Sequence, residues 1–141
     1  DYNAQQFKRQ LSHFLDFSDG KGIVENNADW LLDLNFLEFV REIGIHFSVS
    51  RMLTFDCYKN RLGEGLTFFE FSYMLMQSYD FLYLYRKHHC QLQLGGSDQW
   101  SNMLGGYELV RKLEEDKVYS MTFQLLQTAT GAKMTPTSSS S

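Results

Sequence analysis

The sequence predicts an α/β fold, in which long helices pack against a short parallel sheet, and three observations lead to this class. Proline occurs once in 141 residues while aromatic residues make up 16%, which favours long unbroken helices with bulky apolar faces. Residues 67–70 have the Thr-x-x-Glu pattern of a capping box, which opens a long helix. Residues 90–126 follow a strand, glycine turn, helix and strand pattern, which predicts a parallel, right-handed βαβ unit.

The composition fits one globular domain at most and limits the possible partners. Hydrophobic residues make up 43% and charged residues 21%, the mixture of a soluble protein with a core. The 13 basic and 17 acidic residues give a net charge of -4, so no field over the whole surface would gather DNA or RNA. An RNA contact must therefore be a local patch. No apolar run approaches the roughly 20 residues of a membrane span.

The cysteines indicate the cellular compartment, and the chain ends indicate a fragment with a polar tail. Cys57 and Cys90 have no CxxC spacing, which favours a reducing compartment, the cytoplasm, over a disulfide framework or a zinc site. The chain begins at Asp1 without a Met or a basic and apolar leader, so we expect a fragment of a longer protein. Residues 138–141 form a serine tail, which we expect to be disordered.

Four segments of the first half have helix or turn signals. Apolar residues spaced i, i+4, i+7 and i+8 predict a helix over about residues 4–15, and residues 18–22 end it. Asn35 is placed to cap a helix over residues 36–43. Ser50 is placed to cap a third helix from the next residue, and a short fourth helix is expected over residues 56–62.

The second half alternates helix and strand. The capping box predicts a helix over residues 67–85, and a short alternating segment predicts a strand over residues 90–94. Residues 95–98 then form a glycine turn, which leads into a helix over residues 99–113. Residues 118–126 close the unit as its second strand.

A polar stripe interrupts the apolar surface of the long helix. Tyr73, Gln77 and Asp80 are spaced i, i+4 and i+7, so they fall within an arc of roughly 60° on one side of the helix. Their neighbours are large and apolar, and a Gln or Asp is costly to bury there unless something hydrogen-bonds it. The stripe either faces water or contacts a small polar ligand.

The glycine turn is the second candidate site. Gly95 and Gly96 would let a ligand approach the backbone at the carboxyl end of a strand, where open α/β sheets bind ligands. The carboxylate of Asp98 could accept hydrogen bonds from the two hydroxyls of a ribose. The alternative is that Asp98 or Ser97 only caps the next helix. His88, the next histidine and the following cysteine are adjacent and point apart, so we expect no metal site.

Two segments that carry these residues, 73–81 and 92–100, resemble bacterial-type tyrosyl-tRNA synthetases. Four further segments resemble the same family in the same order, and the resemblance covers nearly the whole chain up to about residue 134. These four segments are residues 14–17, 26–30, 46–49 and 131–134.

The resemblance implies the second half of a Rossmann-like class I aminoacyl-tRNA synthetase catalytic domain with a helical insertion. Residues 1–137 would form this partial domain, with the insertion at about 31–66 and the second Rossmann half at about 67–137. The implied reaction joins L-tyrosine to ATP, with Mg²⁺ accompanying ATP, and transfers the tyrosyl group to tRNA(Tyr) in the cytoplasm. The family also implies a homodimer that pairs through the insertion, with Phe39 and Phe68 as the best candidates for its interface.

The resemblance assigns five residues to the tyrosine substrate. Asp80 would accept a hydrogen bond from the phenolic hydroxyl, and Tyr73 and Gln77 would bind the α-amino group. Gln99 would approach the carboxylate, and Gln93 would lie just behind the groups that touch the substrate.

Three more residues are assigned to the adenylate and the phosphates. Gly96 and Asp98 would hold the ribose, and Lys133 would be the catalytic lysine of a Lys-Met-Ser-Lys-Ser-like loop. Pro136 stands where that loop has its second lysine, and a proline cannot donate a hydrogen bond to pyrophosphate.

The family's His-x-Gly-His-like signature would precede Asp1, so the resemblance implies that this chain by itself makes no detectable tyrosyl-adenylate. Two alternatives stay open. One is a related tryptophan–tRNA ligase, against which Asp80 argues because an indole presents no hydroxyl there. The other is a non-catalytic fragment that folds or pairs through its insertion.

Overall fold

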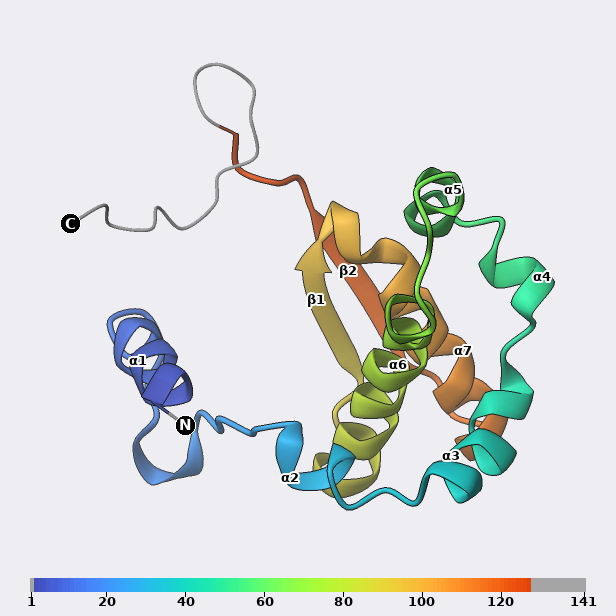
Figure 1. Ribbon diagram of the computed structural model, residues 1–141. Coiled ribbons are helices and arrows are strands. Elements are labelled where there is room, and N and C mark those ends of the chain that lie inside the picture. Colours follow the sequence, from blue (N-terminus) through green and yellow to red (C-terminus); the bar gives the residue numbers. More distant parts are fainter. Residues whose placement is uncertain (1, 128–141) are drawn as a thin grey trace. The chain divides into compact units, whose positions relative to one another are not determined.

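The computed structural model describes residues 2–127, which form parts of two compact units divided between Leu34 and Asn35 (Figure 1). Among the described residues, the first unit holds two short α-helices, and the second holds five α-helices and both strands. We describe each unit separately. No helix among the described residues is both long and apolar enough to cross a membrane.

The first unit begins with helix α1, Tyr2–Leu11, and later forms the single turn of α2, Ala28–Leu31. The sequence predicted a helix over residues 4–15, so its end is wrong by four residues. The hydroxyl of Ser12 donates to the carbonyl of Arg9 at 2.7 Å, and the next amide bonds three residues back instead of four. This tighter turn ends the regular helix.

The predicted break at residues 18–22 is confirmed, and Asp16 organises it. Its carboxylate accepts hydrogen bonds from the Lys21 ammonium at 2.7 Å and from the Ser18 hydroxyl and amide at 2.6 and 2.9 Å. These donors, with Lys21 first, lower the pKa of Asp16 to about 2. Asp19 and Gly20 adopt left-handed φ angles of 51° and 74°, which reverse the chain.

The second unit is built on a two-stranded parallel sheet and two long helices. Strand β1, Leu92–Gly96, pairs with β2, Tyr119–Phe123, in register from end to end. Helix α7, Trp100–Glu114, connects the strands and packs beside α6, Phe68–His88 (Figure 1). The predicted α/β class and the parallel strand–helix–strand unit are confirmed.

Two buried clusters hold this unit together, and both involve α6. One lies between α6 and α7 and includes Phe81, Leu82, Leu109 and Val110, each at most 2% exposed. The other joins α6 to the preceding short helices through Met52, Tyr58 and Met74. These short helices are α4, Val49–Met52, and α5, Asp56–Leu62. Helix α3, Phe36–Glu42, packs against the first cluster through Phe39.

Tyr58 fixes the short helices to α6 with its polar end as well as its ring. Its hydroxyl donates to the carbonyl of Phe71 at 2.8 Å, and the two rings lie 5.2 Å apart between centroids. Burial raises the pKa of Tyr58 to about 12, because the phenolate would lose its hydration.

The predicted N-cap residues were correct for α3 and α6 and wrong for α4. Asn35 accepts hydrogen bonds from two amides at the start of α3, at 3.0 and 3.2 Å. Ser48, and not Ser50, caps α4: its hydroxyl accepts from the amide of Arg51 at 3.4 Å. Ser48 has the extended backbone that an N-cap requires, and Ser50 lies inside the helix.

Helix α6 extends three residues beyond the predicted Tyr85. Tyr85 donates a short hydrogen bond to Asp116, which raises the pKa of the phenol and lowers that of the carboxyl. Arg86 Nε donates to Glu114 Oε1 at 2.8 Å. These contacts with residues at and after the end of α7 support the last turn, and His89 ends the helix at a left-handed φ of 53°.

Strand β1 starts two residues later than predicted and includes both glycines. Gly96 keeps an extended backbone, with φ −70° and ψ 157°, so it continues the ladder opposite Phe123. The turn is therefore the 3₁₀ turn Ser97–Gln99. Strand β2 ends at Phe123, three residues before its predicted end, where its partner strand stops.

Protonation of Glu70 is expected to weaken the start of α6. Glu70 accepts from the Thr67 amide at 3.0 Å, from the Thr67 hydroxyl at 2.8 Å and from Arg61 at 2.8 Å. With the Thr67 amide first, these donors lower the pKa of Glu70 from 4.5 to about 2. Because the folded pKa is depressed, this stabilisation is complete above about pH 4.5 and is lost as the pH falls towards 2.

Thermal unfolding across this pH range tests the expectation. The wild type should unfold at a higher temperature than Glu70→Gln near neutral pH, and the two midpoints should converge between about pH 4.5 and 2. Glu42→Gln removes an exposed carboxylate that caps no helix and serves as the control. A difference between wild type and Glu70→Gln that persists at low pH would argue against the capping role.

Candidate functional site

The polar stripe of α6 is neither wholly exposed nor buried. Tyr73 is 53% exposed, whereas Gln77 and Asp80 are partly covered. The stripe lies beside the buried face of the same helix, which carries Met74, Ser78, Phe81 and Leu82. Polar groups in such a half-covered position can meet a small ligand without the cost of full burial.

The carboxyl end of β1 is closely packed around its two glycines. A Cβ on Gly96 would lie 2.6 Å from both Asp98 Oδ1 and Leu125 Cδ2, and one on Gly95 would lie 2.8 Å from Met103 Sδ. Neither glycine has a positive φ. The glycines were predicted for ligand approach in a turn; in the structure they also make room for the protein's own side chains.

Asp98 lies in the short turn that follows Gly96. Its carboxylate oxygen occupies the space that a side chain at residue 96 would take, so Gly96 determines where this carboxylate can lie. Gln99 occupies the N-cap position of α7, so neither Ser97 nor Asp98 is the N-cap residue of that helix.

Gln99 is hydrogen-bonded to Asn102, a residue that the sequence analysis did not identify. The Asn102 amide donates from Nδ2 to Oε1 of Gln99 at 3.2 Å. Asn102 and Tyr73 in turn line one cavity of about 320 Å³. One cavity therefore connects Tyr73, the first residue of the polar stripe, with Asn102 near the start of α7. The i, i+3 spacing of Gln99 and Asn102 on a helix start could have indicated this pair.

Gln93 lies in β1, and its side chain is partly covered. Its Oε1 is buried and has no hydrogen-bond partner among residues 2–127. Ser120, its neighbour in the parallel register, has a hydroxyl in the same state. An unpaired buried polar group costs about 1–3 kcal/mol, so this pair suits a polar group supplied from elsewhere.

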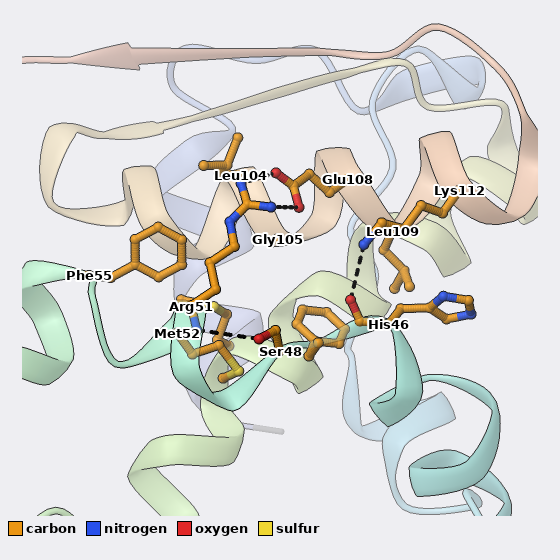
Figure 2. A pocket seen from close by; sticks show the side chains of 12 residues that line it. His46, Ser48, Arg51, Met52, Phe55, Leu104, Gly105, Glu108, Leu109 and Lys112 are labelled. Carbon is orange, nitrogen blue, oxygen red and sulfur yellow. Dashed lines mark hydrogen bonds and ion pairs between the residues drawn. The ribbon is translucent and has the colours of Figure 1, made fainter.

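A second cavity, of about 70 Å³, lies between α4 and α7 and contains none of the predicted site residues. Figure 2 shows Arg51 reaching Glu108, where Nη1 and Nη2 donate at 3.0 and 2.5 Å. Lys112 Nζ donates to the carbonyl of His46 at 3.1 Å. These bonds fasten the short helices to α7, which indicates a structural role for this cavity.

Two predicted features fall in the part of the chain that the structure does not describe. Lys133 lies outside the described residues, and so does the serine tail at residues 138–141. Within the described range, no group of three or more His, Cys, Asp or Glu side chains is placed to hold a metal ion.

All 141 residues match the family described as tRNA synthetases class I (W and Y). The chain therefore belongs to this family, and its α/β fold is part of a Rossmann-like class I catalytic domain.

Two relatives with high identity are tyrosine–tRNA ligases. The chain is 63% identical to the tyrosine–tRNA ligase of Lachnoclostridium phytofermentans, over 95% of this chain and 33% of that protein. It is 62% identical to the tyrosine–tRNA ligase of Acetivibrio thermocellus, over 94% of this chain and 33% of that protein. The chain thus spans about a third of the length of the curated relatives that it matches.

Solved structures lead to the same group. The crystal structure of a C-terminally truncated mitochondrial tyrosyl-tRNA synthetase from Coccidioides posadasii matches with a TM-score of 0.75 and 30% identity. The match covers 93% of this chain and 43% of that one. The likeness in fold thus extends through nearly the whole chain.

Proposed function

We propose that this chain forms the tyrosine- and ribose-binding part of a tyrosine–tRNA ligase. The reaction would join L-tyrosine to ATP, releasing pyrophosphate, and then transfer the tyrosyl group to tRNA(Tyr). One observation carries the proposal: Tyr73 of the α6 stripe lines the same cavity as Asn102, whose amide is hydrogen-bonded to Gln99 at the start of α7. The identity of 63% to a tyrosine–tRNA ligase supports it.

The proposed tyrosine site uses the length of α6 to separate the two ends of the substrate. Tyr73 and Gln77, one turn apart, would receive the α-amino group, and Asp80, a further turn along, would accept the phenolic hydrogen. A rise of 1.5 Å per residue places Asp80 about 10 Å from Tyr73 along the axis, enough to follow the length of a tyrosine. Gln99 would donate to the carboxylate, with Gln93 behind it.

The proposed ribose site uses Gly96 and Asp98. A carboxylate with four acceptor positions suits two ribose hydroxyls, and it would orient the adenosine at the carboxyl end of β1. Catalysis by these residues would be positioning of the two substrates, with Lys133 proposed to stabilise charge on the phosphates. Mg²⁺ would accompany ATP as part of that substrate.

The proposed assembly is a cytoplasmic homodimer that pairs through the helical insertion, at about residues 31–66, and the adjoining start of α6. Phe68 is 68% exposed and Phe69 is 70% exposed at that start, and Phe36 is 63% exposed on α3. Such apolar residues commonly mark a protein interface. Phe39 is the weaker candidate, because it packs against the buried cluster and its ring meets Tyr79 edge-on at 5.6 Å.

A full-length carrier enzyme can test these roles. In this enzyme, the matched 134 residues of this chain replace the corresponding segment of the L. phytofermentans ligase, which is 63% identical. We expect the carrier enzyme to charge tRNA(Tyr) with tyrosine and not tryptophan. Charging of a tRNA with tryptophan instead would favour the tryptophan–tRNA ligase alternative, and loss of all charging would favour the non-catalytic one.

Gly96→Ala is expected to weaken ATP binding in the carrier enzyme. The new Cβ would displace the Asp98 carboxylate, which lies 2.6 Å from its position. We expect KM for ATP to rise at least about tenfold, which corresponds to ~1.4 kcal/mol, with a smaller change in KM for tyrosine. Gly63→Ala, where a Cβ meets nothing within 4 Å, is the control. An unchanged KM for ATP would remove Gly96 from the ribose site.

A further inference from the structure

The hydrogen bond between Asn102 and Gln99 restricts how the Gln99 amide can face a ligand. Both side chains are partly buried at the start of α7, where Gln99 is the N-cap residue and Asn102 lies three positions later. The bond is 3.2 Å long and runs from the Asn102 amide nitrogen to the Gln99 carbonyl oxygen.

The two ends of a glutamine amide have opposite hydrogen-bonding character. The carbonyl oxygen only accepts and the NH₂ group only donates, so a donor held against the oxygen fixes which end is available elsewhere. With its oxygen bonded to Asn102, Gln99 presents its NH₂ group. A carboxylate accepts hydrogen bonds and donates none when ionised, so it is matched by this orientation and repelled by the reversed one.

We propose that Asn102 is a positioning residue, which holds the Gln99 amide with its NH₂ group towards the carboxylate of the amino-acid substrate. This inference rests on the proposed function, because it takes the ligand of Gln99 to be tyrosine. Asn102 acts through Gln99 and does not itself touch the carboxylate. Asn102 lines the same cavity as Tyr73, one of the two residues proposed for the α-amino group.

Binding of two ligands to the carrier enzyme separates this role from general packing. L-Tyrosine has the carboxylate, and tyrosinol has an alcohol in its place. We expect Asn102→Ala to weaken tyrosine binding about fivefold to tenfold and to change tyrosinol binding less than twofold. Equilibrium dialysis with each ligand gives the dissociation constants.

Asn102→Asp is the sharper variant, because it keeps the shape and reverses the chemistry. An ionised aspartate can only accept, so it would bond the Gln99 NH₂ group and turn the carbonyl oxygen towards the substrate. We expect Asn102→Asp to bind tyrosine more weakly than Asn102→Ala does. Asn60→Ala, at an exposed position of α5, is the control for loss of an asparagine.

A double-mutant cycle distinguishes failure of the inference from failure of the proposed function. In a Gln99→Ala background, Asn102→Ala should add no further loss of tyrosine binding. If Gln99→Ala weakens tyrosine binding and Asn102→Ala does not, the inference is wrong and the role of Gln99 stands. If Gln99→Ala has no effect, the proposed role of Gln99 is wrong. Equal losses for tyrosine and tyrosinol in Asn102→Ala would assign Asn102 to packing and overturn the inference.

Discussion

Asp80→Ala is expected to remove most of the preference of the carrier enzyme for tyrosine over phenylalanine. A site that hydrogen-bonds a hydroxyl leaves its own polar group unpaired when phenylalanine enters, and this penalty is the source of discrimination. Tyrosyl-tRNA synthetases are the established example of this principle, and they discriminate against phenylalanine by a factor of about 10⁵. Alanine removes the carboxylate that would hydrogen-bond the phenolic hydroxyl.

The change should appear in the ratio of kcat/KM for tyrosine to that for phenylalanine. We expect Asp80→Ala to lower this ratio at least about a hundredfold, or ~2.7 kcal/mol, while KM for ATP changes little. The ratio for Asp80→Asn should fall between those of the wild type and Asp80→Ala, because the asparagine carbonyl can still accept the phenolic hydrogen. Asp33→Ala removes an exposed aspartate and is the control. If Asp80→Ala rejects phenylalanine as strongly as the wild type, Asp80 does not read the hydroxyl.

Phe68→Asp is expected to shift the carrier enzyme from dimer to monomer. A charge duplicated near a two-fold axis repels its copy and loses hydration in a buried interface. We expect the dissociation constant of the dimer to rise by a factor of about 100 or more. The fold itself should tolerate the change, because Phe68 is the first residue of α6 and an aspartate there interacts favourably with the helix dipole.

Sedimentation at matched micromolar concentrations measures this effect. Asn3→Asp adds the same charge at an exposed position of α1, outside the insertion, and should leave the dimer intact. A dimeric Phe68→Asp enzyme that remains folded would exclude Phe68 from the interface. A monomeric wild-type carrier enzyme would exclude the interface altogether.

Local signals predicted the helix starts well, because a cap depends on a few neighbouring residues. Thr67 with Glu70 and Asn35 make the expected bonds, and their helices begin where predicted. Ser48 and Ser50 show the limit of such reasoning. Both can cap a helix, and only the extended backbone at Ser48 decides between them.

Element ends were predicted less well, since tertiary contacts determine them. Helix α6 continues past Tyr85 because its last turn bonds to residues at and after the end of α7, about 30 positions later in the chain. Strand β1 includes Gly95 and Gly96 because β2 continues beside them. No local pattern in residues 90–98 contains that information.

In the candidate site, too, local spacing was predictable from the sequence and tertiary contacts were not. Helical spacing placed Tyr73, Gln77 and Asp80 on one side of a helix, as α6 has them. The bond from Asn102 to Gln99, and the space that Gly96 leaves for Asp98, depend on side-chain positions in three dimensions. Sequence spacing can suggest such neighbours, but it does not say which donor faces which acceptor.

Exchange of labelled pyrophosphate into ATP tests the central claim most directly, because it follows adenylate formation without tRNA. The proposed function predicts that the carrier enzyme catalyses exchange with tyrosine and not with tryptophan. The parent L. phytofermentans ligase, prepared in the same way, is the positive control. A folded carrier enzyme that shows no tyrosine-dependent exchange, while its parent does, would contradict the claim that this chain forms the tyrosine and ribose sites of a tyrosine–tRNA ligase.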